Sequence, residues 1–157
     1  MNNSFKAGLG FGITSAVITT LGLMVGLLES TESKLAVIAG IITIAIVDAL
    51  SDSMGIHLSQ EYSKNTDKNV WVATFSTLIS KLIIGLTFLI PILIFEIKTA
   101  IKINIGWGFL IIIFFSYVVA KSKNEKPSRA IFEHVGIFVF VLFLTYYLGK
   151  LIAIIFK

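Results

Sequence analysis

The stretch AGLGFGITSAVITTLGLMVGLL, residues 7–28, runs for 22 residues without a charged side chain. A transmembrane helix needs about 20 consecutive apolar residues to cross a hydrocarbon layer of about 30 Å. The stretch is too long for the core of a signal peptide, and no small-residue cleavage site follows near its end. We therefore expect it to stay in the mature protein as a membrane-spanning helix.

Four further apolar segments follow, each long enough to cross a membrane. Backbone polar groups find no water inside lipid, so segments this continuously apolar are expected to be helical. The composition agrees, since 56% of the residues are hydrophobic and 14% are charged, against about half and a quarter in soluble domains. The sequence predicts an all-α polytopic protein, integral to the lipid bilayer (the plasma membrane in a prokaryote), with a single transmembrane domain over residues 1–157. Its five helices are expected at about 7–28, 35–58, 70–95, 103–120 and 131–156, and Asn104 is expected to act as a turn former near one connection.

The distribution of basic residues predicts the orientation of the chain. Cytoplasmic loops of membrane proteins carry an excess of lysine and arginine. Seven basic residues fall on the amino-terminal side of the expected spans and four on the other side. The amino terminus is therefore expected in the cytoplasm and the carboxyl terminus on the opposite side. The seven are Lys6, Lys64, Lys68, Lys121, Lys123, Lys126 and Arg129, and the four are Lys34, Lys98, Lys102 and Lys157.

Several function classes find no support in the sequence. It contains no P-loop, GxSxG or HExxH motif, so we do not expect an enzyme. It contains no cysteine, so any metal ligand has to be an oxygen, an imidazole or a thioether. The net charge is +4, but the basic residues sit mainly in loops rather than in one stripe, and nucleic acid is not an expected partner.

Three ionisable residues lie inside apolar segments, where charges are costly and normally face a partner, a cavity or a pathway. Asp48 and Asp52 are four residues apart, so both carboxylates lie on one face of a helix. At 1.5 Å per residue, Asp48 and Lys81 each lie about 16 Å inward from the same side of the membrane. They can therefore meet across an antiparallel helix pair, and Ser15 lies at a depth close to that of Asp52.

Two interpretations of this polar layer stay open. The carboxylates, with Ser15, Ser51 and the thioether of Met54 nearby, would suit a divalent transition-metal cation along an ion pathway. Alternatively, Lys81 is a counter-ion that fixes the helix register, and nothing binds. Two acids and one base leave one carboxylate without a fixed partner, which favours a proton or cation site.

Small residues pattern the first two expected helices, which should therefore pack closely. Gly22 and Gly26 form a GxxxG motif, which lets helix backbones approach each other. The motif fits ordinary packing within one chain as well as a seam between two copies. The spacing alone does not separate these two arrangements.

The sequence GFGITSAVITTLGLMVGL, Gly10–Leu27, resembles the first helix of the vacuolar iron transporter family, and IVDALSDSMGIHLSQE, Ile46–Glu61, resembles its second. The likeness is specific over about residues 8–62. It implies a homodimer whose first helices line a path for Fe²⁺ or Mn²⁺ out of the cytoplasm, in exchange for protons, with no permanently bound cofactor. The chain is similar to a small form that lacks the family's cytoplasmic metal-binding insert.

Two departures from that family fall at positions that the resemblance implies to be ion contacts: Ser15 stands where the family has an aspartate, and Asp52 where it has a methionine. A third departure is Ile56, which stands where the family has a glutamate after the glycine of the second helix. In one reading, Asp52 replaces the lost acid, and transport of a divalent cation persists. In the other, Asp48, Asp52 and Lys81 neutralise one another, and the chain is a non-transporting membrane scaffold or interaction protein.

Overall fold

A computed structural model describes residues 3–156 as an all-helical bundle, with no strand in that range. Five spans are long and apolar enough to cross a membrane, which confirms the predicted number. The third span consists of two helices separated by a break. The helices are α1 (Asn3–Thr31), α2 (Lys34–Tyr62), α3 (Asp67–Thr87), α4 (Leu89–Ile94), α5 (Ile97–Ser122) and α6 (Pro127–Ile155).

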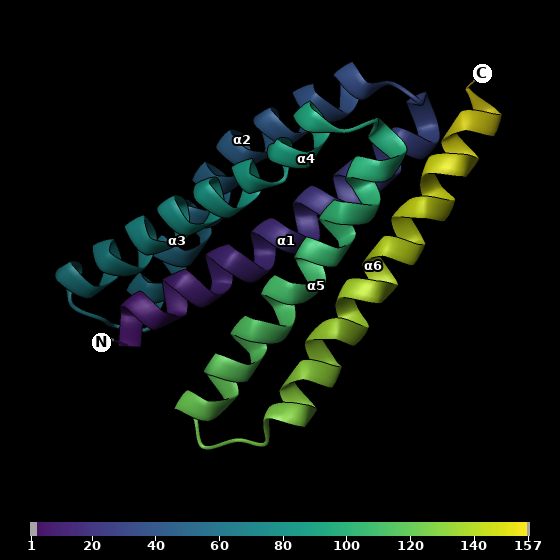
Figure 1. Cartoon of the computed structure of the whole chain (residues 1–157). Helices are drawn as coiled ribbons and strands as arrows, with labels where there is room; N and C mark the ends of the chain where they lie inside the picture. Colours follow the sequence, from purple (N-terminus) through teal and green to yellow (C-terminus); the bar gives the residue numbers. More distant parts are fainter. Residues whose placement is uncertain (1–2, 157) are drawn as a thin grey trace.

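Helix α1 forms the centre of the bundle, between α2, α3 and α4 on one side and α5 and α6 on the other (Figure 1). Its buried residues dominate the core, with Val17, Leu21 and Met24 fully enclosed. Helix α6 lies at the periphery and buries only Phe138 and Gly149.

The connections between the helices are short and built by local capping. Ser33 precedes α2 and its side chain accepts a hydrogen bond from the amide of Ala36, which satisfies one of the free N–H groups at the helix start. Glu32, Lys64 and Asn124 have φ angles of 51°, 53° and 58°. A left-handed residue just after a helix is a common way to end it, so the chain reverses direction within a few residues.

The helices extend beyond the apolar runs that predicted them, most of all at the fourth span. Helix α5 begins at Ile97, so the segment expected as a connection up to Lys102 is helical. Asn104 is not a turn former: it lies inside α5 and is completely buried. The prediction was wrong because it relied on the turn propensity of asparagine. In the folded protein, the Asn104 side chain has a hydrogen-bond partner inside the bundle, so the residue is accommodated within a helix.

That partner is the break between α3 and α4. Pro91 has no N–H, so the carbonyl of Thr87 loses its helical partner and the helix breaks there. The Asn104 side-chain nitrogen donates to the carbonyl oxygen of Phe88 at 2.9 Å. The Trp107 indole donates to the hydroxyl of Thr87 at 3.1 Å. Helix α5 therefore holds the break in place.

Asn104→Leu is expected to lower the free energy of unfolding by about 1–3 kcal/mol, because a buried hydrogen bond is lost without a replacement. The measurement is thermal unfolding of the purified chain in detergent, followed by circular dichroism. Asn65→Ala serves as a control, since Asn65 is exposed and bonds only Gln60 in the same turn. Equal melting temperatures for the two variants would contradict this role of Asn104.

Small residues of α1 allow α3 to approach its backbone closely. A Cβ at Gly8 would lie 2.1 Å from the Ser76 hydroxyl and 2.3 Å from the Ala73 carbonyl oxygen. The hydroxyl of Thr77 donates to the Gly8 carbonyl at 3.1 Å. The close neighbour of this part of α1 is therefore α3, in addition to the α2 contact that the sequence predicted.

Gly8→Ala is expected to lower the free energy of unfolding by about 1–3 kcal/mol, because overpacking forces the backbones of α1 and α3 apart. Gly10→Ala is the matched control on the same helix, since a Cβ at Gly10 would meet nothing within 4 Å. Thermal unfolding in detergent compares the two. If both variants melt like the wild type, the close approach of α1 and α3 is not a stabilising contact.

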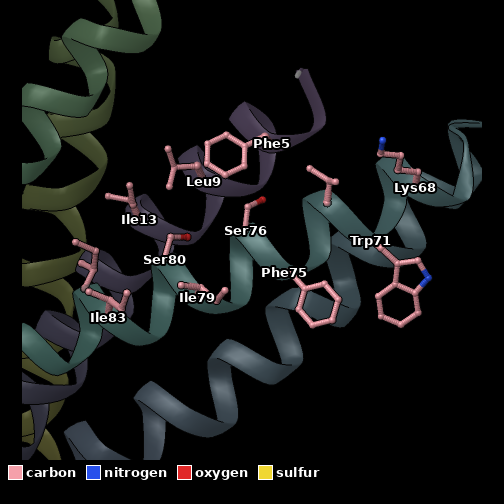
Figure 2. Close-up of a pocket in the computed structure, with 12 residues that line it drawn as sticks. Phe5, Leu9, Ile13, Lys68, Trp71, Phe75, Ser76, Ile79, Ser80 and Ile83 are labelled. Atoms are coloured by element: carbon pink, nitrogen blue, oxygen red, sulfur yellow. The ribbon is translucent and has the colours of Figure 1, made fainter. Parts of the chain in front are cut away.

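The outer surface of the bundle is apolar. Along α3, Phe75, Ile79 and Ile83 are each more than half exposed. They line one side of an open groove of about 660 Å³, and α1 lines the other (Figure 2). Exposed apolar surface on this scale is unusual for a soluble monomer and is compatible with a multi-pass membrane protein. The α1 side of the groove is formed by Phe5, Leu9 and Ile13.

Candidate functional site

The most unusual side chain in the bundle is Lys81 of α3, which is only 1% exposed. Its ammonium nitrogen lies 2.5 Å from Oδ2 of Asp48 and makes a still shorter contact with Oδ2 of Asp52. It also donates to the hydroxyl of Ser15 at 2.9 Å. The prediction that Lys81 meets an acid of the second helix is confirmed. These four residues are called the acid–lysine centre below.

Three helices supply this centre because of their register. Asp48 and Asp52 lie one turn apart on α2, and the antiparallel α3 carries Lys81 past them. Helix α1 packs against both α2 and α3, which places Ser15 beside Asp52. The Ser15 hydroxyl donates to Oδ2 of Asp52 at 2.6 Å. The expected match in depth between Ser15 and Asp52 is thereby confirmed.

The two carboxylates of the centre are bound differently. Oδ2 of Asp52 accepts hydrogen bonds from both Ser15 and Lys81. Oδ2 of Asp48 is buried and accepts no hydrogen bond of acceptable geometry, so its contact with the ammonium is an ion pair by distance alone. The Asp48 side chain is also the more exposed, at 28% against 21% for Asp52. Asp48 is therefore the less firmly held of the two acids.

The charges in the centre do not balance when all three groups are ionised. Two carboxylates and one ammonium leave one negative charge, and no second lysine or arginine is paired with either acid among residues 3–156. Desolvated charge of this kind is expensive unless it meets a counter-charge. The centre therefore carries one unbalanced negative charge, which a proton or a further cation would neutralise.

The other predicted site residues lie at different distances from this centre. Ser51 is exposed and lines a groove of about 620 Å³ together with Asp48, between α1 and α2. Met54 is 56% exposed. Because it follows Asp52 by two residues, its side chain leaves α2 on nearly the opposite side. The structure thus joins Ser51 to Asp48 through a groove, and it places the Met54 thioether away from the carboxylates.

The groove connects Asp48 with the outer surface of the bundle. Its walls are mostly apolar, with Leu23 and Leu27 from α1 and Ile44 and Val47 from α2. Its polar members are Thr43, Asp48 and Ser51, and the last two lie at the end of the groove that follows α2 toward its carboxyl terminus. An ion or water molecule that reaches Ser51 is therefore adjacent to the less firmly held carboxylate.

The oxygen atoms at the centre suit a hard divalent cation. Mg²⁺ and similar ions are bound by one or two carboxylates and keep several waters. Residues 3–156 contain no cluster of three or more histidine, aspartate or glutamate side chains that could hold a metal ion. The two aspartates and the serine hydroxyl are the oxygen ligands that this chain brings together, and the Lys81 ammonium lies between them.

Gly22 and Gly26 face α6 of the same chain. A Cβ at Gly22 would lie 3.3 Å from Val141, and one at Gly26 would lie 3.8 Å from the Thr145 carbonyl oxygen. A Cβ at Gly149 would in turn lie 2.7 Å from the Gly26 carbonyl oxygen. Of the two arrangements that the GxxxG motif allowed, the structure places these glycines in packing within one chain.

Asn104 is the buried polar residue that the sequence reasoning missed. Its Oδ1 is enclosed and has no hydrogen-bond partner among residues 3–156, and its nitrogen contacts the Met24 sulfur at 4.0 Å. A signal was present, since an amide flanked by Ile103 and Ile105 in an apolar run is costly without a partner. Asn104 lies two residues after Lys102, where the predicted connection ended, and was therefore interpreted as part of a turn.

Comparison with known proteins adds no assignment. The chain matches no protein-family model, no curated protein and no solved structure. The resemblance over residues 8–62 therefore stays a prediction.

Proposed function

We propose that this protein is a membrane transporter of divalent transition-metal cations, Fe²⁺ or Mn²⁺, which exports them from the cytoplasm in exchange for protons. The observation that carries the proposal is the unbalanced negative charge of the acid–lysine centre. Asp48 and Asp52 meet one ammonium, inside a bundle whose outer surface is apolar. Ionisable residues at such positions mark ion pathways in membrane proteins.

The proposed path enters through the groove beside Ser51 and reaches Asp48 before Asp52. The buried oxygen of Asp48 accepts no hydrogen bond and is held only by its ion pair with Lys81, which favours Asp48 as the first ligand of an arriving cation. Asp52, with Ser15 beside it, supplies the further oxygen ligands. Met54 would contact the ion only in another arrangement of α2, because in this one its thioether faces outward.

The proposed orientation has the amino terminus in the cytoplasm. The α2–α3 and α5–α6 connections carry most of the loop lysines, and the α2–α3 connection lies beside the amino terminus (Figure 1). An excess of basic residues on that side favours the cytoplasm. We also propose a homodimer, in which a second copy would cover the partly exposed carboxylates on the α2 face.

A second candidate function is a membrane scaffold or interaction protein of the same fold. It is favoured by one specific observation, namely that Lys81 contacts both acids and Ser15 at once. In that case the polar centre fixes the register of α1, α2 and α3 and binds no ion. The two candidates differ in whether the purified protein moves cations.

The deciding experiment is uptake of Mn²⁺ and Fe²⁺ into liposomes that contain the purified protein, with and without a pH gradient. We expect uptake that depends on the gradient and is absent from protein-free liposomes. Cation uptake at the same rate with and without the pH gradient would indicate a channel and contradict proton coupling. No flux from protein that is folded by circular dichroism would favour the scaffold.

A further inference from the structure

We infer that Lys81 is a tethered cation that excludes monovalent ions from the Asp48–Asp52 pair, so that the pair accepts only ions of charge two or more. The inference rests on the proposed function and adds to it the basis of ion selectivity. It assigns Lys81 a role beyond that of a counter-ion. The role follows from where the ammonium lies and from how Coulomb attraction depends on charge.

The ammonium occupies the position that a bound cation would take. It contacts one oxygen from each carboxylate and the Ser15 hydroxyl, and so has three oxygen neighbours from two helices. The Lys81 side chain is 2% exposed, so ions in solution have no access to the ammonium's position while the ammonium occupies it. An incoming ion therefore has to displace Lys81 before it can reach both acids.

Displacement depends on the charge of the incoming ion. At a given distance and dielectric, attraction to the carboxylates is proportional to that charge. Na⁺ or K⁺ offers the same single charge as the ammonium, and the ammonium has the advantage of covalent attachment, which gives it a high effective concentration at the site. A divalent ion offers twice the charge. The tether therefore discriminates against monovalent ions that are abundant in solution.

Lys81 also limits the charge that the centre carries. With all groups ionised, the empty centre has a net charge of −1, and with a divalent ion and Lys81 still nearby it has +1. Without Lys81 the empty centre would carry −2 inside an apolar bundle, which is the more costly state. The displaced ammonium need not leave the site, because the Ser15 hydroxyl is already within hydrogen-bond distance.

The test compares the full-length wild type with Lys81→Met and with Lys81→Arg, which keeps the charge. Each protein is purified in detergent, and thermal unfolding is measured while NaCl replaces N-methylglucamine chloride at constant ionic strength. We expect Na⁺ to raise the melting temperature of Lys81→Met, because an ion that binds only the folded state stabilises it. The wild type and Lys81→Arg are expected to show no such dependence.

A second readout is Mn²⁺ binding, measured by electron paramagnetic resonance in the same buffers. At a Na⁺ concentration ten times its dissociation constant, competition should weaken apparent Mn²⁺ binding to Lys81→Met by about tenfold. Binding to the wild type should be unchanged. Asp48→Asn/Lys81→Met keeps the net charge of −1 but lacks the tether, and it serves in place of Lys81→Met if that variant does not fold.

The outcomes separate the inference from the proposed function. If Na⁺ affects the wild type and the variants that lack the tether equally, or affects none of them, the inference is overturned, even if the wild type transports Mn²⁺. If Na⁺ stabilises only the variants that lack the tether, the inference is supported. Absence of Mn²⁺ flux through the wild type would overturn the proposed function by itself, since the Na⁺ measurement requires no transport.

Discussion

Asp52→Asn is expected to reduce Mn²⁺ or Fe²⁺ uptake to the level of protein-free liposomes while leaving the protein folded. Asparagine has nearly the same shape as aspartate and keeps an oxygen that can accept the hydrogen bond from Ser15. What it removes is the negative charge. The remaining pair, Asp48 and Lys81, is then neutral, so the centre loses its capacity for an additional cation.

The measurement is uptake under a pH gradient, with the folded state checked by circular dichroism and gel filtration. Asp67→Asn is the matched control, because it makes the same chemical change at an exposed position in the first turn of α3. We expect Asp67→Asn to transport like the wild type. Transport by Asp52→Asn at the wild-type rate would show that the cation does not pass through the acid–lysine centre.

Lys81→Met is expected to destabilise the protein by about 3–5 kcal/mol, because removing one partner of a buried ion pair leaves its carboxylates uncompensated. Methionine fills much of the same volume, so the loss of charge dominates over any loss of packing. The effect should be measured by thermal unfolding in N-methylglucamine chloride, where no small monovalent cation can substitute for the ammonium.

Lys68→Met is the control for this change, since it removes an exposed lysine from the same helix. Surface substitutions of this kind usually alter stability by less than about 0.5 kcal/mol. The variant Asp52→Asn/Lys81→Met should recover part of the lost stability, because only one unpaired acid is left. If Lys81→Met melts at the wild-type temperature, the contacts of the ammonium do not stabilise the fold.

The acid–lysine centre was largely predictable from the sequence because helices convert residue number into depth. Asp48 and Lys81 lie equally far from the α2–α3 connection, and two antiparallel helices must bring such residues to one level. Counting residues along the first helix in the same way predicted that Ser15 lies at the depth of Asp52. What counting could not provide is the direction of each side chain around its helix, which is why Met54 was grouped with the acids.

The details outside the centre depended on tertiary partners that the sequence does not name. Gly22 and Gly26 predict a close helix–helix contact, but the motif does not specify that the partner helix is α6. The third span was expected to be one continuous helix over residues 70–95, whereas Pro91 divides it into α3 and α4. The hydrogen bond from Asn104 that holds this break comes from a residue that looked like part of a loop.

The central position of α1 also has a consequence for how the protein is made. Gly26 of α1 packs against Thr145 and Gly149, more than a hundred residues away in the chain. Helix α6 is synthesised last of the six helices, so the Gly26 face of α1 has no packing partner until α6 has left the ribosome. The contact between α1 and α6, the first and the last of these helices, can therefore form only at the end of their synthesis.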